Sequence, residues 1–186
     1  MKACSVDRDG NADGFVPEEG FIGQTEPGMP TRLLVSVLPE RLAAAHRALI
    51  EVVNGPFGVR WVQKVDRSAP KEGAPPREFL ALDVPKDGVL EALSTCAGVL
   101  YDDARGELWV RGRRGEQIIL DGDGLLYGYP DDLLFRDAAI AFGLAETDVK
   151  TLLNRDYVKQ WYRAEHDADE RRLIELLGLR VIGGGK

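Results

Sequence analysis

Three aspartates occur in or directly after apolar runs of the strand type, and carboxylates in that position suit metal-dependent chemistry. Asp83 lies in the run 78–84, and Asp131 and Asp132 come directly after the run 125–129. Carboxylates that converge from neighbouring strand ends can hold two metal ions about 4 Å apart across a reacting phosphate. One hypothesis is therefore a metal-dependent phosphoryl-transfer or nuclease-like enzyme with Asp83, Asp131 and Asp132 as its catalytic residues.

The tetrapeptide Tyr129-Pro130-Asp131-Asp132 resembles the Y-x-D-D motif of reverse transcriptases. The resemblance covers these few residues only, and the segment after them has the pattern of a helix rather than of a second hairpin strand. Helix capping explains both acids without a metal, because Asp131 caps a helix over 133–142 and Asp132 lies at its positive N-terminal end. We favour capping, so the enzyme is the alternative hypothesis.

A second acidic set lies near the N-terminus, in the segment DRDGNADGFVPE. The spacing of its oxygen-bearing side chains resembles an EF-hand calcium loop, and hard cations prefer such ligands. The set comprises Asp7, Asp9, Asn11, Asp13 and Glu18. The match fails at Ala12, where the turn glycine is missing, and the six residues before the segment are too few for an entering helix. We therefore interpret the segment as a solvated tail and expect no metal site.

The other nucleophiles and metal ligands are isolated from one another. The chain has two histidines, His46 and His166, and two cysteines, Cys4 and Cys96, without a CxxC pair. His46 and Cys96 fall on the apolar stripes of predicted helices, a position typical of core residues. No G-x-S-x-G elbow, Walker A sequence or G-x-G-x-x-G turn is present. The sequence thus indicates neither a catalytic triad nor a cofactor.

The charge of the chain argues against nucleic acid and for a protein partner. The formal net charge is −7, with 31 acidic residues against 24 lysines and arginines, whereas nucleic-acid binders usually have a basic face. An acidic surface suits a basic protein through charge complementarity. We expect the partner to be another protein, basic in character, and expect neither nucleic acid nor a membrane.

Two groups of residues are the candidates for contact with that partner. Arg111, Arg113 and Arg114 lie at the tip of a predicted hairpin, where guanidinium groups can clamp carboxylates. Tyr157 and Trp161 lie on a predicted long helix, and aromatic side chains are frequent interface anchors. A solvated turn and a core stripe are the simpler explanations of the two groups.

The elements that position these residues centre on the stretch 107–144. Its three apolar runs, 108–111, 117–121 and 125–129, are joined by the connectors GRRG and GDG, which are typical of tight hairpins. We predict a β-meander that leads into a helix over 133–142.

The preceding part of the chain alternates strand and helix patterns. We predict strands over 32–38, 59–66 and 78–84, and helices over 40–53 and 86–97. With the first strand of the meander they give the order β-α-β-β-α-β, which is typical of ferredoxin-like α+β folds. The fold prediction is a ferredoxin-like core extended by the meander, followed by a helical region over 145–178 with helices over 147–154 and 156–177.

The composition predicts one domain between two flexible ends. Residues 1–28 are rich in Gly, Asp, Glu and Pro and are expected to form a flexible tail. Residues 29–182 are of a length that suits a single α+β domain, and 183–186 form a flexible end. No run reaches the ~20 apolar residues of a membrane span, and no apolar stretch of a secretion signal follows Lys2, so we expect a cytoplasmic location.

The sequence therefore favours a small acidic protein-binding module over an enzyme. An inhibitor or immunity-type protein that neutralises a basic toxin or enzyme is the specific expectation. It rests on the charge of −7 and on the missing catalytic set.

Overall fold

The computed structural model describes most of the chain, and its centre is an antiparallel sheet. The described residues are 2–25, 27–28, 30–65, 76–151, 153, 155–159 and 163–183. The sheet has eight strands in the order β10-β5-β4-β6-β7-β8-β3-β2, and every neighbouring pair is antiparallel. The strands are β2 (Gly20–Gln24), β3 (Arg32–Ser36), β4 (Phe57–Gln63), β5 (Arg77–Val84), β6 (Gly106–Arg111), β7 (Gln117–Leu120), β8 (Leu126–Tyr129) and β10 (Arg180–Gly183).

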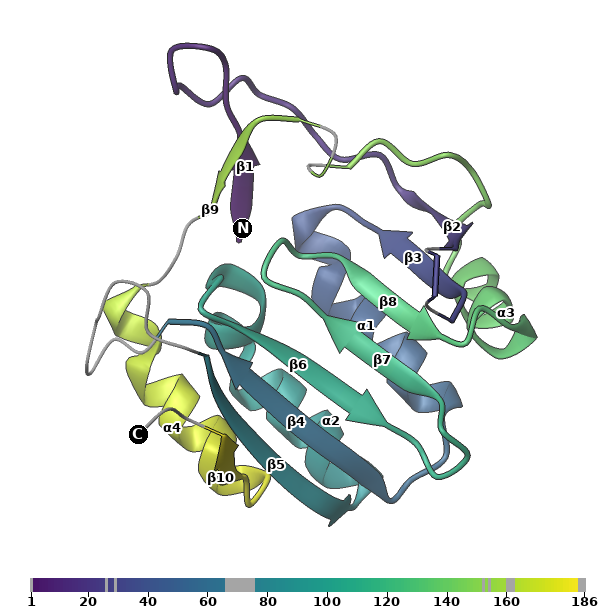
Figure 1. The fold of residues 1–186 in the computed structure, drawn as a ribbon, viewed down its shortest axis with the longest axis vertical. Coiled ribbons are helices and arrows are strands. Elements are labelled where there is room, and N and C mark those ends of the chain that lie inside the picture. The colour runs from purple at the N-terminus through teal and green to yellow at the C-terminus, as the bar shows by residue number, and fades with distance from the viewer. Residues whose placement is uncertain are drawn as a thin grey trace.

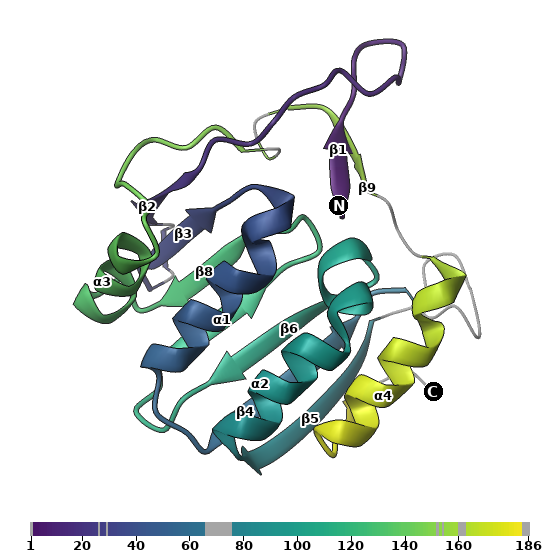
Figure 2. The ribbon, with the colours of Figure 1, turned by 180° about the vertical axis from the view of Figure 1, so that it is seen from behind.

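Helices cover one face of this sheet, and the other face lies open toward the viewer in Figure 1. The view from behind in Figure 2 shows α1, α2 and α4 across the strands, with α3 beside the β2 and β3 end. The α-helices are α1 (Leu42–Val52), α2 (Lys86–Thr95), α3 (Leu133–Ala141) and α4 (Asp167–Leu176). Shorter turns precede α1 (η1, Pro39–Arg41) and α4 (η4, Ala164–His166), and a π-helical turn follows α2 (η2, Gly98–Asp102).

The alternation of side chains along the strands decides which face is buried. On β6, Leu108 and Val110 are buried and point to the helices, while Trp109 between them points to the open face and is half-buried. The buried row joins the apolar faces of the helices in one hydrophobic cluster, in which Trp61 is 0% exposed. A second, smaller buried cluster around Leu34, Ile119 and Tyr127 lies on the opposite face, and burial of both clusters stabilises the fold.

The strand order differs from the predicted ferredoxin-like core. The element order is confirmed, because β3-α1-β4-β5-α2-β6 follow one another as β-α-β-β-α-β. The strands β5 and β6 flank β4, as in a split β-α-β unit, but β6, β7 and β8 all lie between β3 and β4. The reason is the meander, because its short connections keep β6, β7 and β8 side by side and β3 then pairs with β8.

Part of the predicted N-terminal tail belongs to the sheet. Residues Gly20–Gln24 form β2, which pairs with β3 along five residue pairs, and Phe21 is 1% exposed. Residues Ala3–Ser5 form β1, which pairs with β9 (Tyr157–Lys159) in a separate two-stranded sheet. Strand pairing satisfies the backbone hydrogen-bonding groups of these segments, so they are ordered although they contain few apolar residues.

The predicted C-terminal helices are only partly correct. Tyr157–Lys159 is strand β9 rather than the beginning of a long helix, because its backbone pairs with β1. The helix begins instead at Asp167 and ends at Leu176, close to the predicted end. In the described part of 147–154 no α-helix forms, since this segment runs beside β2, where the N–H of Thr147 donates to the carbonyl oxygen of Phe21.

A buried arginine joins α4 to the sheet. Arg105 is 0% exposed and forms ion pairs with Asp103 at 2.8 Å, Asp167 at 2.8 Å and Glu170 at 3.2 Å. Its Nη2 also donates to the carbonyl oxygen of Arg163 at 2.9 Å. Because a buried charge without partners costs several kcal/mol, these partners must stay in place.

The carboxylate of Glu170 extends this network to β4. Its Oε1 accepts from Trp61 Nε1 and from Gln63 Nε2, each at 3.0 Å. Since Glu170 belongs to α4, strand β4, the segment before β6 and helix α4 share one set of polar contacts. The network therefore fixes the position of α4 on the sheet.

The Lys2 side chain attaches the N-terminal segment to the β7–β8 turn. Lys2 is 3% exposed, and its Nζ donates to the carbonyl oxygen of Asp121 at 2.7 Å. Burial lowers the pKa of Lys2 from 10.5 to about 8, although nearby carboxylates act in the opposite direction.

Replacement of Arg105 tests the buried network. We expect Arg105→Met to lower the free energy of unfolding by about 3–5 kcal/mol, because it leaves buried carboxylates without a cation. Arg47→Met is the matched control, since Arg47 forms an exposed i,i+4 pair with Glu51, and it should cost less than about 1 kcal/mol. Urea unfolding at pH 7 measures both. A loss below that of the control would contradict the role of Arg105.

The pH dependence of stability tests the burial of Lys2. The folded protein releases this proton near pH 8 and the unfolded chain near 10.5, so the unfolded state binds more protons between these values. The free energy of unfolding of the natural chain should therefore rise with pH from about 8 to 10.5, relative to Lys2→Met, in urea unfolding. Other titrating groups cancel in that difference. A difference that stays flat across the window would show that Lys2 is not buried.

Candidate protein-binding surface

The three candidate catalytic aspartates do not meet. Asp83 ends β5, whereas Asp131 and Asp132 follow β8, and three strands lie between these two. Four strand spacings correspond to roughly 19 Å, too far for a shared two-metal site. Asp83 is exposed and has a φ of 56° beside an irregularity in the β4–β5 register, a conformation that aspartate tolerates in a bulge.

The two aspartates before α3 have separate structural roles. Asp132 is the N-cap, and its Oδ1 accepts from the N–H of Leu134 at 3.0 Å. Asp131 instead accepts from Arg136 Nε at 2.6 Å and Nη2 at 2.9 Å. The prediction that capping explains these acids is correct in kind, but the capping residue is Asp132 and not Asp131.

The acidic side chains of the segment that resembles an EF-hand loop contact different partners. Asp7 Oδ1 accepts from the N–H groups of Asp9 and Asn11, each at 2.9 Å, so it closes its own turn. Asp13 accepts from Arg155 Nη2 at 2.7 Å, and Glu18 lies beside Lys150. Within the described ranges no three His, Cys, Asp or Glu side chains gather in a way that could hold a metal ion.

The carboxylate of Asp13 is a strongly acidic group. Its pKa falls to about 2, because it accepts hydrogen bonds from the N–H of Phe15, from Arg155 and from Ser5. The guanidinium of Arg155 also lies 4.6 Å from the centre of the Phe15 ring. These contacts connect the β1 and β9 segments, so Asp13 has a structural role.

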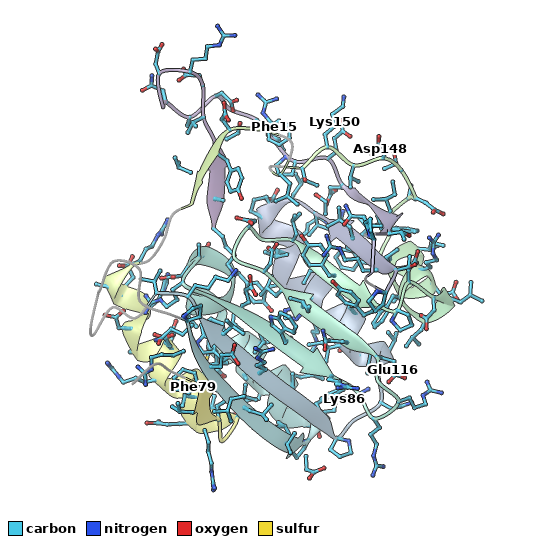
Figure 3. All side chains as sticks on the ribbon, viewed as in Figure 1. Phe15, Phe79, Lys86, Glu116, Asp148 and Lys150 are labelled. Atoms are coloured by element: carbon cyan, nitrogen blue, oxygen red, sulfur yellow. The ribbon has the colours of Figure 1, made fainter. Side chains whose placement is uncertain are left out.

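The five predicted binding residues do not form one surface. Arg111, Arg113 and Arg114 are exposed at the β6–β7 hairpin, and Arg114 Nε donates to Glu116 Oε1 at 2.9 Å. In Figure 3 Glu116 lies at the lower right, well below Phe15, which marks the segment after β1. Tyr157 lies on β9 beside β1, far from the hairpin. Trp161 lies outside the described residues.

Two aromatic rings on the open face of the sheet are covered by arginine side chains. Arg60 lies 5.0 Å above the ring centre of Trp109 and pairs with Glu78 at 2.6 Å. Arg32 lies 4.6 Å above the ring centre of Tyr127 in the same way. Such stacks cover aromatic surface with the side chains of neighbouring strands, so this face needs no partner to bury its rings.

The outer side of α3 exposes large apolar side chains, as β5 and β10 also do at Leu82, Val181 and Ile182. Leu133 is 74% exposed and Ile140 is 59% exposed, and they are seven residues apart on the same side of the helix. Asp137 lies between them and is exposed. We call these three residues, together with the N-cap Asp132, the α3 surface.

The inner side of α3 fixes this surface on the sheet. Phe135, Ala138 and Ala139 are buried against α1 and the strands. The ring of Phe135 lies directly on β8, where a Cβ at Gly128 would be 2.8 Å from it. Since glycine alone permits so close an approach, the position of α3 depends on Gly128.

The basic residue of α3 is already paired with carboxylates. Arg136 is the only basic residue within α3, and it pairs with Asp131 at 2.6 Å and with Glu146 at 2.7 Å. Asp148 follows Glu146 on an exposed segment and lies at the upper edge of the molecule in Figure 3. Asp148 thus lies apart from α3, and Asp137 is the acidic residue that lies between Leu133 and Ile140.

Sequence analysis did not single out this surface, although the sequence has a signal for it. The segment LLFRDAAIA is apolar on nearly every side, which is usual for a fully buried helix. A helix of this composition at the end of a sheet must leave some of its apolar residues in solvent.

Comparison with known proteins gives no relative: no protein-family model, no curated protein and no solved structure matches the chain. None of the helices in the described part has the length and apolar content that crossing a bilayer requires.

Substitutions on the two sides of α3 should separate surface from core. We expect Leu133→Gln and Ile140→Gln to change the free energy of unfolding by no more than about 0.5 kcal/mol, because both side chains are exposed. Phe135→Ala should cost about 3–5 kcal/mol, since its ring is fully buried. Urea unfolding measures all three. A loss above about 2 kcal/mol at position 133 or 140 would mean that these residues serve the fold.

Proposed function

We propose that this protein is a small acidic protein-binding module whose α3 surface docks a basic protein. The specific form of the proposal is an inhibitor or immunity-type protein that neutralises a basic toxin or enzyme in the cytoplasm. The observation that carries it is the exposure of Leu133 and Ile140 within an acidic surround.

Apolar exposure supports the choice of α3. Large apolar side chains that stand together on one helix face are typical of interaction sites, and burying them against a partner gains about 25 cal/mol per Å². Seven residues of helix separate Leu133 from Ile140 by roughly 10 Å along the axis. The two side chains can therefore serve as two anchors of one partner groove.

Charge supports the choice of a basic partner. Asp137 lies between the anchors, and the chain as a whole has a formal charge of −7. Local and overall charge have the same sign, so long-range steering and short-range contact favour the same class of partner. By contrast, the arginines at the β6–β7 hairpin would select carboxylates and would act against the overall charge.

Photo-crosslinking in the native cell tests this proposal. A benzoylphenylalanine at position 133 should give a discrete covalent adduct whose second component has a positive net charge when identified by mass spectrometry. The same group at Glu91, an exposed position on α2, should not give that adduct. Position 91 serves as the matched control because it is also exposed on a helix.

Charge reversal then distinguishes docking from chance contact. We expect Asp137→Lys to reduce the yield of the adduct severalfold, because two units of charge change between the anchors. Glu91→Lys should leave the yield unchanged. Equal adducts at positions 91 and 133, a partner of negative net charge, or an adduct insensitive to the reversal would each refute the proposal.

A further inference from the structure

An asparagine followed by a glycine lies just after α1, at the edge where α1, α2 and the β6–β7 hairpin meet. Asn54 is the second residue after the helix, and the backbone N–H of Arg113 in the hairpin donates to its carbonyl oxygen at 3.4 Å. A Cβ at Gly55 would lie 3.6 Å from the backbone nitrogen of Lys86, the first residue of α2. Lys86 and Glu116, which mark α2 and the hairpin, both lie at the lower right in Figure 3.

The side chain of Asn54 is available for reaction. The residue is exposed, and within the described ranges no hydrogen bond holds its carboxamide. The carbon of a carboxamide is an electrophile, because its oxygen can accept the electron pair that an attacking nitrogen displaces. Asn54 therefore presents an electrophilic carbon next to its own backbone.

The backbone nitrogen of Gly55 is the nearest nucleophile in the sequence. Gly55 lies outside the helices and strands, and its N–H takes part in none of the hydrogen bonds among the described residues. Glycine has no side chain to shield the nitrogen, and its backbone rotates more freely than that of other residues. Attack on the side-chain carbon of Asn54 closes a five-membered ring, and such an intramolecular reaction needs no encounter in solution.

The hairpin assists this attack through the oxygen of the same peptide group. The nitrogen reacts after losing its proton, and the negative charge then spreads to the carbonyl oxygen of Asn54 because the two atoms share one conjugated amide. This oxygen already accepts from the N–H of Arg113, so a donor lies where charge develops. Arg111 and Arg113 are exposed and form no ion pair in the part of the chain that the structure describes, so their charges act in the same direction.

Close packing holds the hairpin against Asn54. A Cβ at Gly112 would clash with the Val53 side chain and would lie 3.3 Å from the carbonyl oxygen of Asn54. The N–H of Gly112 donates to the carbonyl oxygen of Glu116 at 2.7 Å, and the Glu116 carboxylate accepts from the N–H of Arg114 at 3.0 Å. These bonds fix the turn, so the donor stays beside the peptide group that follows Asn54.

We propose that Asn54 is a self-modification site, which the chain converts from an amide to a carboxylate through attack by the Gly55 nitrogen. This nitrogen gives its proton to water, and its electron pair forms a bond to the side-chain carbonyl carbon. The C–NH₂ bond breaks, and the amino group takes up a proton and leaves as ammonia, which gives a succinimide. Water then adds to one ring carbonyl and opens the ring to aspartate or isoaspartate. The sum is amide plus water giving carboxylate plus ammonium, without any change in oxidation state.

The reaction changes the charge of this edge of the molecule. It adds one negative charge to the formal −7 of the chain, on the residue that the hairpin contacts. The new carboxylate offsets the positive charge of Arg111 and Arg113. Conversion therefore weakens the hairpin as a site for an external carboxylate.

Incubation of the full chain tests the reaction. The protein is kept at pH 7 for several weeks, and conversion of each asparagine is followed by peptide mass spectrometry after a brief digestion at acidic pH. We expect Asn54 to convert at least about tenfold faster than Asn11, which is also exposed but is followed by alanine. A rate at Asn54 no higher than that at Asn11 would overturn the proposal.

Two comparisons show whether the folded site is responsible. Gly55→Ala should fold normally, because its Cβ would make only ordinary contacts of 3.6 Å with Lys86 and the Phe57 ring, and urea unfolding checks this. The added methyl crowds the nitrogen and should slow conversion at least about tenfold. The natural chain should convert at least as fast when folded as in guanidinium chloride, where the N–H of Arg113 no longer assists. An unchanged rate in Gly55→Ala, or faster conversion in the unfolded chain, would refute the site.

Discussion

The short connections of the meander are the constraint on which the rest of this fold depends. Because β6, β7 and β8 are joined by tight turns, they must lie side by side, and β3 can enter the sheet only beyond β8. This order separates β3 from β4 by three strands. It also places the end of β8, and with it α3, far from the end of β5. The distance between Asp83 and Asp132 is therefore a result of local turn geometry.

Features that depend on residues close together in the sequence could be predicted, and features that depend on distant residues could not. The hairpins, the helix after β8 and the order of elements were predicted because glycine turns, apolar periodicity and capping residues act within a few positions. The strand order was not, since pairing of β3 with β8 joins residues about ninety positions apart. Strand β9 was read as helix for the same reason, because its partner β1 lies at the other end of the chain.

The same difference between near and distant interactions applies to the candidate sites. Acidic residues were found by type, yet their roles came from partners that the sequence does not reveal, such as Arg136 for Asp131 and Arg155 for Asp13. The sequence also did not reveal which apolar side chains are exposed to solvent. Leu133 and Phe135 have similar character and lie two positions apart, but one is in solvent and the other is fully buried. Only the packing of α3 on β8 decides between them.

Gly128 has a consequence that reaches beyond the core. It lies inside β8 and is buried, and its hydrogen in place of a side chain lets the Phe135 ring rest on the strand. Any larger residue there would lift α3 away from the sheet and carry Leu133 and Ile140 with it. The position of the exposed α3 residues is thus set by a buried residue that no partner can touch. A substitution inside the molecule can therefore shift this surface without changing any exposed residue.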